Sequence, residues 1–271
     1  MNIKIFMCTH KAVDFIPPLC VCVQGGAKIN APIQGALSDD GANGSISEKN
    51  PHYCELTVQY YAYKNEDCDY YGFCHYRRFF GAQNNKKTPY LTLGKPKAEL
   101  IASENEIRAL CDSYDVILPR SENVGMSVYE KYVSSPHHFK DDLDKFIDII
   151  AENAPQLLPY AKEYLNGCEQ YFCNMMIMRA DIFKEYSALL FDLLEKFELQ
   201  KTLHGYFEAD RTNGYLAERF LGIYALYLKS KGVIIYHLPR VDAYCSFKKR
   251  FINKLLPPGS KLRLKIKRGV K

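Results

Sequence analysis

Short apolar runs typical of buried strands alternate with helical patterns along most of this 271-residue chain. The apolar runs occupy positions 3–8, 70–74, 115–118, 171–178 and 232–238. Helical patterns occupy positions 50–65, 103–111, 181–197 and 215–228. This alternation favours an α/β fold in which helices flank a mostly parallel central sheet. No long linker rich in Pro, Gly and Ser divides the chain, so we expect one folded domain.

Charge is distributed unevenly along the chain. Positions 246–271 contain ten Lys and Arg residues and no acidic residue, so the rest is net acidic although the whole chain carries +5. We therefore expect a domain at 1–245 and a basic tail at 246–271. No nucleic-acid partner is expected, because a domain that binds nucleic acid spreads its positive charge over a folded face. Apolar residues among the cations of the tail favour an anionic membrane surface; a disordered solubilising terminus is the alternative.

The sequence contains no segment that resembles a signal peptide or a membrane span. The apolar run at its start is too short for a signal peptide. No stretch approaches the roughly 18 to 20 continuous apolar residues needed to cross a bilayer. Ten irregularly spaced cysteines without a CxxC pair argue against disulfides and a zinc site. We expect reduced thiols in a cytoplasmic protein that attaches peripherally to the inner face of the membrane.

Four polar residues, His75, Tyr76, Arg77 and Arg78, directly follow the strand predicted at 70–74. Polar groups at the carboxyl end of an α/β strand usually face a ligand. Adjacent arginines offer planar, permanently charged groups that suit phosphate or carboxylate oxygens. The cluster therefore predicts an anion site, and a surface cluster paired with acidic neighbours is the alternative.

A second polar corner, Thr9, His10 and Lys11, ends the strand predicted at 3–8. The carboxyl end of the first strand commonly meets the nucleotide in nucleotide-binding α/β folds. We therefore place the nucleotide side of a ligand pocket at this corner.

The stretch 25–44 predicts a long loop that contains Asp39 and Asp40. Solvated turn residues are the favoured interpretation of this pair, and metal ligands are the alternative. A literal DxD motif occurs at 67–69, but it precedes the strand and so lies at its wrong end for a ligand site.

Several boundaries follow from local signals. Asn50 and Pro51 predict the start of the helix at 50–65, and Asp181 predicts the cap of the helix at 181–197. Positions 81–99 show little apolar pattern and predict an exposed excursion, and positions 120–138 predict irregular structure.

Five motifs carry a resemblance to a known family. They are MCTHK at the amino terminus, SEKNPHYCEL, FCHYRRFF, CNMMIMRADIF and NGYLAERFL, in that order. Together they resemble the bacterial family known as domain of unknown function 4422 over about residues 1–240. Members accompany capsule and exopolysaccharide synthesis and are similar to sugar-nucleotide glycosyltransferases with a Rossmann-type GT-A fold. The resemblance implies a glycosyltransferase; a non-catalytic sugar- or phosphate-binding assembly protein of such a pathway is the alternative.

An inverting glycosyltransferase needs a carboxylate that accepts the proton of the acceptor hydroxyl. Glu218 lies in the matching LAERF motif, within a helix that is apolar nearly all round. It shares a helix face with Arg211 and Tyr215, and a buried structural pair with Arg211 or Arg219 is the alternative role. Glu169 is the second candidate base, although surface exposure is the ordinary fate of a glutamate.

The remaining assignments follow from the resemblance. A nucleotide-sugar donor, with a UDP-sugar favoured, would bind through residues 9–11, residues 75–78, Arg211 and Arg219. The sugar would be galactofuranose or another hexose, and the acceptor a lipid-linked capsular, exopolysaccharide or O-antigen glycan near Tyr132 and His138. Because arginines follow the strand that carries DxD in related folds, we expect no required cofactor. Mn²⁺ or Mg²⁺ held by Asp39 or Asp40 is the alternative.

Overall fold

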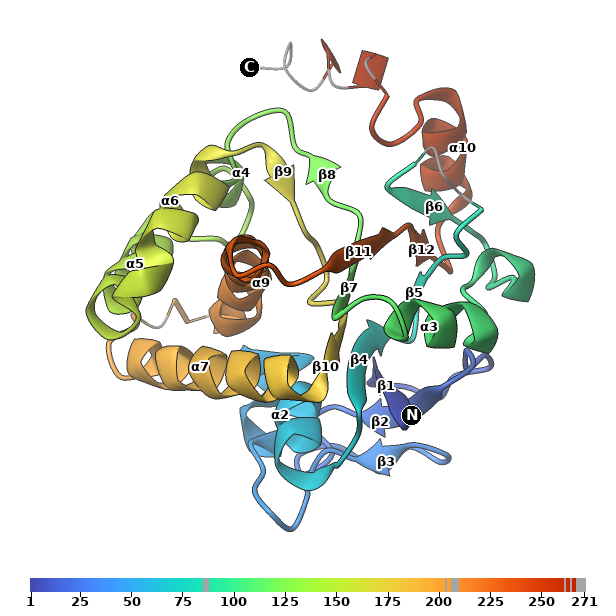
Figure 1. Cartoon of the computed structure of the whole chain (residues 1–271), viewed down its shortest axis with the longest axis horizontal. Helices are drawn as coiled ribbons and strands as arrows, with labels where there is room; N and C mark the ends of the chain where they lie inside the picture. Colours follow the sequence, from blue (N-terminus) through green and yellow to red (C-terminus); the bar gives the residue numbers. More distant parts are fainter. Residues whose placement is uncertain (85–87, 203, 206–209, 261, 264, 267–271) are drawn as a thin grey trace.

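The computed structural model describes residues 1–84, 88–202, 204–205, 210–260, 262–263 and 265–266. Its centre is a sheet with the strand order β11-β7-β10-β4-β1-β2-β3 (Figure 1). The strands of this path are β1 (Ile3–Thr9), β2 (Cys20–Gln24), β3 (Leu37–Ser38), β4 (Tyr70–His75), β7 (Val116–Pro119), β10 (Met176–Arg179) and β11 (Ile235–Leu238). Neighbours are parallel except at β10, which is antiparallel to both β4 and β7. The predicted mixed, mostly parallel α/β sheet is confirmed.

Helices cover both faces of the sheet. They are α1 (Asn50–Tyr53), α2 (Leu56–Asn65), α3 (Glu104–Cys111), α4 (Val128–Val133), α5 (Lys140–Asn153), α6 (Leu158–Asn166), α7 (Ala180–Glu198), α9 (Thr212–Ser230) and α10 (Phe247–Leu255), with short 3₁₀ turns η1 (Ser47–Lys49), η2 (Ala98–Leu100) and η3 (Pro155–Leu157). In Figure 1, α2, α7 and α9 lie on one side of the sheet and α3 lies on the other. The sheet is therefore buried on both faces, as parallel sheets usually are.

Two apolar layers follow from the alternation of side chains along the strands. Phe6 and Phe73 point into the layer shared with α2, α7 and α9, whereas Ile5 and Met7 point into the layer under α3. Gly72 makes the centre of the sheet compact, because a Cβ at this position would lie 2.7 Å from Cγ1 of Ile5. Burial of each large apolar side chain stabilises the fold by roughly 1.5–3 kcal/mol.

Two segments are more ordered than their sequence suggests. The predicted excursion at 81–99 contains β6 (Tyr90–Thr92), which pairs with β12 (Arg240–Asp242), and β12 also pairs with β5 (Arg78–Phe80). The segment at 120–138, expected to be irregular, contains β8 (Glu122–Asn123), paired with β9 (Glu169–Gln170), and helix α4. Pairing with strands distant in sequence supplies the order that local patterns do not show.

Three boundary predictions are wrong. The helix predicted at 50–65 is broken between α1 and α2, where Cys54 has a positive φ of 53°. Residues 171–175 precede β10 rather than belong to it, and both Cys173 and Asn174 have positive φ. Asp181 does not cap α7; its carboxylate binds the guanidinium of Arg179 instead.

The tail forms helix α10 against β6. Lys249 Nζ donates to Asp242 at 3.2 Å, and Arg263 Nη2 donates to the Tyr90 hydroxyl at 3.4 Å. No residue of α10 is buried. Positions 261, 264 and 267–271 of the predicted tail lie outside the described residues. Within the described part of the chain, no helix is both long and apolar enough to cross a membrane.

Candidate active site

The carboxyl edge of the sheet brings together segments from distant parts of the chain. Parallel pairing aligns Cys8 of β1 with His75 of β4, so the residues after both strands emerge at the same edge. Because β10 runs the opposite way, the residues that precede it, Cys173 and Asn174, also lie at this edge. Two of the predicted polar clusters therefore meet there, as expected for a ligand site of an α/β sheet.

The segment formed by Cys173 and Asn174 is the centre of this site. Both residues have positive φ, at 79° and 45°, which costs roughly 1–3 kcal/mol for each non-glycine residue. The amide of Cys173 donates to Glu218 Oε1 at 2.7 Å. Its carbonyl lies 2.7 Å from Nε2 of His75, and the Asn174 side-chain amide donates to Glu55 Oε1 at 2.8 Å. Three side chains thus hold one strained segment.

Glu218 projects from the buried helix α9, and its side chain is 19% exposed. Its Oε2 accepts a hydrogen bond from Arg219 Nη1 at 2.9 Å. Burial raises the pKa of the Glu218 carboxyl; the Arg219 guanidinium lowers this pKa but does not cancel the effect of burial, and Glu55 adds to the rise. A carboxylate of raised pKa suits a general base near neutral pH. The ion pair with Arg219, which the sequence predicts as the alternative structural role of Glu218, is also present.

Arg219 is almost entirely enclosed, with 3% of its side chain exposed. Besides Glu218, its Nη1 reaches the Tyr215 carbonyl at 3.0 Å, and its guanidinium lies 5.0 Å from the ring centre of Tyr132. These contacts place Arg219 behind the carboxylate, where it orients Glu218.

Glu55 is a carboxylate that sequence reasoning missed. Its side chain is 19% exposed and its Oε1 lies 3.9 Å from His75 Nε2. Burial lowers the pKa of His75, although Glu55 acts in the opposite direction. The Nε2 of His75 carries a proton, because the Cys173 carbonyl only accepts hydrogen bonds. The sequence predicts one continuous helix at 50–65, in which Glu55 would be an ordinary helical residue. The only sequence signal for a role in the site is its position in the SEKNPHYCEL motif.

Lys11 and Arg77 form a cationic group around the ring of Tyr76, and the ring of His10 packs against the same tyrosine. Lys11 Nζ lies 5.0 Å from the ring centre and the Arg77 guanidinium 5.6 Å, while the His10 ring meets it edge-on at 5.0 Å. Burial lowers the pKa of His10, and the charges of Arg77, Lys11 and Arg211 lower it further. No carboxylate of the described residues lies within 4.0 Å of Lys11 or Arg77. This group therefore fits an anionic ligand.

Thr9 is 1% exposed, and its hydroxyl donates to the Lys11 carbonyl at 2.6 Å, so it shapes the corner. The tandem arginines separate in the fold. Arg77 lies in the tight turn between β4 and β5, whereas Arg78 begins β5 and interacts electrostatically with Asp242 and Glu218. The two side chains face different groups: Arg77 lies beside the ring of Tyr76, whereas Arg78 faces Asp242 and Glu218.

The residues predicted for the acceptor region form an aromatic group next to α9. The ring of His138 stacks on Tyr215 at 4.0 Å, and Tyr132 meets His138 edge-on at 4.7 Å. Burial lowers the pKa of His138 to about 4, so its ring is neutral at pH 7. Arg211 lies one turn before Tyr215, and its Nε donates to Cys54 Sγ at 3.1 Å.

The other predicted carboxylates lie elsewhere. Glu169 accepts hydrogen bonds from Ser121 Oγ at 2.8 Å and Asn123 Nδ2 at 2.9 Å, on the small sheet of β8 and β9. Asp39 is completely buried, which contradicts the solvated turn predicted for it, whereas Asp40 is exposed.

The carboxylate of Asp39 accepts hydrogen bonds from the amides of Gly26 and Ala27 and from the Ser47 hydroxyl, so it closes the loop at 25–44. Across the described ranges, no three His, Cys, Asp or Glu side chains are grouped as a metal site would require.

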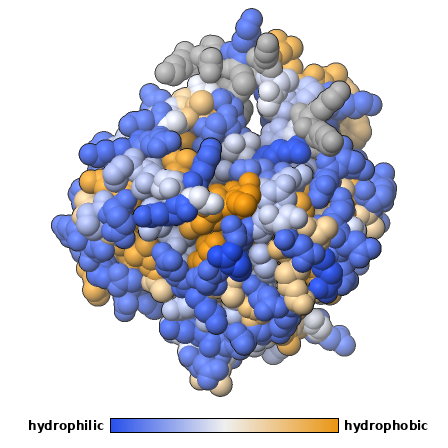
Figure 2. All heavy atoms as spheres, in the orientation of Figure 1, coloured by the Kyte–Doolittle hydropathy of each residue, from blue (hydrophilic) through white to orange (hydrophobic). Residues whose placement is uncertain are grey.

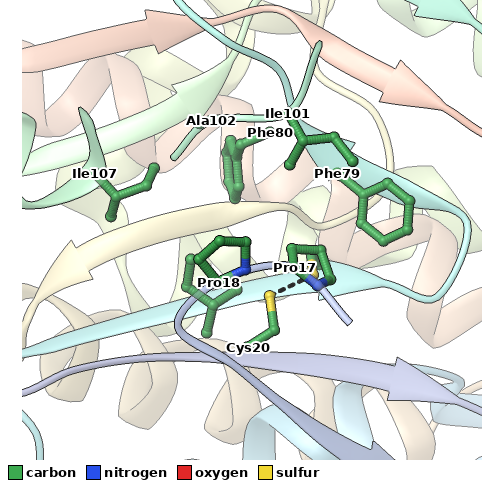
Figure 3. Close-up of a pocket in the computed structure, with 10 residues that line it drawn as sticks. Pro17, Pro18, Cys20, Phe79, Phe80, Ile101, Ala102 and Ile107 are labelled. Carbon is green, nitrogen blue, oxygen red and sulfur yellow. Dashed lines mark hydrogen bonds between the residues drawn. The ribbon is translucent and has the colours of Figure 1, made fainter. Parts of the chain in front are cut away.

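Two pockets lie near this edge. Glu55, His75 and Asn174 line the first, together with Phe6, Cys8, Gln59, Phe73 and Cys74. Figure 3 shows the second, which lies on the other face of the sheet and is lined by Pro17, Pro18, Phe79, Phe80 and other apolar residues. Cys20 and Cys74 approach there to 3.9 Å between sulfurs. The second pocket has no charged side chain in its lining, whereas the first contains Glu55 and His75.

A solved glycosyltransferase structure has a similar fold. The solved structure described as "WbbM bifunctional glycosytransferase apo structure" superposes with a TM-score of 0.83 at 27% sequence identity. The match covers 90% of this chain and 45% of that one, so the chain spans less than half of the solved protein. No curated protein sequence matches this chain significantly. Residues 4–230 match the family described as "Domain of unknown function (DUF4422)", and the chain belongs to that family.

Proposed function

We propose that this protein is a glycosyltransferase that moves a sugar from a nucleotide-sugar donor to a glycan acceptor. One observation carries the proposal: a carboxylate of raised pKa, Glu218, and a cationic group around Tyr76 are assembled at the same edge of the sheet. The likeness to a solved bifunctional glycosyltransferase supports it.

In the proposed reaction, Glu218 accepts the proton of an acceptor hydroxyl. The acceptor oxygen forms a bond to the anomeric carbon while the bond from that carbon to the diphosphate breaks. The departing nucleoside diphosphate takes the electron pair, and the charges of Lys11, Arg77 and Arg78 stabilise it. The neutral ring of His10 lies beside them and donates or accepts a hydrogen bond according to its tautomer.

The acceptor is proposed to lie against His138 and Tyr215, which are half-buried, whereas Tyr132 is completely buried and supports them through its edge-on contact with His138. Sugar rings have apolar faces that pack on aromatic side chains, and the stacked pair of His138 and Tyr215 provides such a surface one helical turn from Glu218. Glu169 is the alternative base, but its carboxylate is bound to Ser121 and Asn123. We therefore assign the proton transfer to Glu218.

The donor is proposed to be a UDP-sugar, with galactofuranose or another hexose as the group transferred. The acceptor is proposed to be a lipid-linked capsular, exopolysaccharide or O-antigen glycan, in keeping with the family. Arginine side chains take the place of a cation, so Mn²⁺ or Mg²⁺ is not strictly required.

The tail is proposed to hold the protein at the cytoplasmic face of the membrane, where a lipid-linked acceptor would lie. Phe247, Phe251 and Leu255 of α10 are 73%, 52% and 64% exposed, and cationic residues lie between them. Figure 2 shows apolar atoms exposed over α10, near the top of the view. A basic helix with exposed apolar side chains is typical of an interfacial anchor.

A donor screen tests the function directly. Thermal shift with UDP-, GDP-, CMP- and dTDP-sugars, with and without Mn²⁺, identifies the donor. Slow release of free nucleotide from that donor, absent in Glu218→Gln, then establishes transfer chemistry. Binding of a sugar nucleotide without any release of nucleotide, with or without acceptor glycans, would instead favour the non-catalytic assembly protein.

A further inference from the structure

The break between α1 and α2 is held in an unusual backbone conformation. Cys54 has φ 53° and ψ −128°, outside the regions that a non-glycine residue ordinarily occupies. Its carbonyl accepts hydrogen bonds from Asn50 Nδ2 at 2.7 Å and Thr57 Oγ1 at 3.2 Å, and its sulfur accepts one from Arg211. Strain persists where the surroundings determine the conformation, and such sites are often functional. Here the break determines where the next residue, Glu55, points.

Glu55 meets the strained segment that precedes β10. Its Oε1 accepts the hydrogen bond of Asn174 Nδ2, and the same amide nitrogen also reaches the Gly214 carbonyl of α9 at 3.2 Å. His75 lies between the two partners, 3.9 Å from Glu55 and 2.7 Å from the Cys173 carbonyl. Glu55 and Glu218 therefore hold neighbouring residues of one segment from two different elements.

We propose that Glu55 is a positioning residue of the active site, which holds the segment of Cys173 and Asn174 so that the Cys173 amide orients the Glu218 carboxylate. The inference rests on the proposed role of Glu218. It explains why a carboxylate lies at a strained helix break with no basic side chain of the described residues within 4.0 Å except the His75 ring.

The charge of Glu55 also acts on Glu218. The groups that interact with the Glu218 carboxylate are Arg219 on its own helix, Glu55 and Cys54 at the helix break, Arg78 of β5, Cys173 before β10 and Tyr164 of α6. Glu55 is the carboxylate among them, and a like charge favours the protonated form of its neighbour. Removing that charge should make Glu218 more acidic.

Two substitutions separate the contact from the charge. Glu55→Gln keeps an acceptor oxygen for Asn174 but removes the charge, whereas Glu55→Ala removes both. We expect Glu55→Gln to lower the titration midpoint of the Glu218 carboxyl by about half a pH unit or more. The midpoint is measured by ¹³C NMR, and the Glu218 signal is identified by its absence in Glu218→Gln. We expect only Glu55→Ala to speed hydrogen exchange at the Cys173 amide, by about tenfold or more.

Glu66 offers a matched control, because its side chain is similarly buried, with 14% exposed. It lies before the start of β4, at the opposite edge of the sheet, and its carboxylate binds Lys4 Nζ at 2.7 Å. Glu66→Gln and Glu66→Ala should leave both readouts unchanged. Asn174→Ala removes the same contact from its other side, so it tests the positioning role if Glu55→Ala does not fold; it should speed Cys173 exchange.

Unchanged Cys173 exchange in Glu55→Ala or in Asn174→Ala would overturn the positioning role, whereas an unmoved Glu218 midpoint in Glu55→Gln would overturn the effect of the Glu55 charge. Both readouts use the full-length protein without substrate. Faster Cys173 exchange in Glu55→Ala, in a protein that releases no nucleotide from any sugar nucleotide, would support the positioning role of Glu55 and count against the proposed function alone.

Discussion

The amide of Cys173 donates a hydrogen bond of 2.7 Å to the carboxylate of Glu218, joining segments 45 residues apart in the chain. This bond ties the buried helix α9 to the entry of β10, where Cys173 has a positive φ. The orientation of Glu218 and the path of the chain into the sheet therefore depend on each other.

Glu218→Gln should abolish transfer while donor affinity and melting temperature stay near those of the wild type. The amide keeps the shape of the side chain and an acceptor for Cys173, but it cannot accept the proton, so we expect a loss of about 10²-fold or more in kcat. If the pair with Arg219 is structural instead, the unpaired buried guanidinium should cost about 3–5 kcal/mol of unfolding free energy. Parallel measurement of turnover, donor binding and thermal melting decides between these outcomes, and a large drop in melting temperature would move the base to Glu169.

Arg77→Ala and Arg78→Ala should each weaken donor binding without altering the fold. Loss of one charge-assisted hydrogen bond to a diphosphate costs about 1.5–3 kcal/mol, which calorimetry with the identified donor can measure. Arg108→Ala is the control, because Arg108 lies on α3 and pairs with Glu104 at the exposed surface. Unchanged donor affinity in both Arg77→Ala and Arg78→Ala would contradict the proposed anion site.

His138 should contribute to a loss of stability in mild acid. Its pKa falls from an ordinary 6.5 to about 4 in the folded protein because burial disfavours the charged ring. Between these pH values the unfolded chain binds more protons than the folded one. The contribution of His138 to the free energy of unfolding is therefore fully present above pH 6.5 and is lost as the pH falls toward 4. The pKa values of His10, His75 and His237 are lowered in the same direction. His138→Phe, which keeps an aromatic ring on Tyr215, should therefore reduce the drop in melting temperature between pH 7 and pH 4.5 without removing it; an identical drop would contradict the assignment.

Asp39→Ala should destabilise the protein, whereas Asp40→Ala should have little effect. Asp39 satisfies two backbone amides and a hydroxyl in a buried position, so its loss should cost about 3 kcal/mol or more. Thermal or urea unfolding of the two neighbouring variants provides the comparison.

Metal use is tested by an activity assay. Transfer by the wild type should survive EDTA, because arginine side chains are proposed to take the place of a cation. Activity that EDTA abolishes and Mn²⁺ restores would show that a cation takes part.

Replacing Phe247 and Phe251 of α10 with serine should weaken binding to anionic vesicles at high salt more than at low salt. Electrostatic attraction by the cations is screened over about 8 Å at physiological ionic strength, whereas the apolar contribution is not. Co-sedimentation with vesicles that contain phosphatidylserine, at two salt concentrations, measures both parts. Deletion of residues 246–271 should abolish binding but also remove the contacts of Lys249 and Arg263 with the domain, so its melting temperature must be compared. Equal binding by the wild type and the deletion variant would exclude the tail as the anchor.

The sequence determined the alternation of the main strands and helices and the edge at which the polar clusters lie, although it did not predict β2, α5 or α6. Strands and helices are specified by periodicities of two and about 3.6 residues, which are local, so β1, β4, β7, β11, α3 and α9 were all predictable within a few residues. The ends of β1 and β4 were recognisable for the same reason, because a change from apolar to polar residues marks where a strand leaves the core.

The tertiary structure alone decided which side chains meet. Cys54, Cys173 and Asn174 have positive φ although none is glycine, and no local pattern specifies that conformation. Those turns bring Glu55 to the site. Asp39 is buried because backbone amides of its own loop enclose it, and a carboxylate among turn residues gives no sign of this in the sequence. The physical reason is common to these cases: the contacts join residues far apart in the chain or depend on strained backbone, and their free energy comes from the assembled fold rather than from neighbours in sequence.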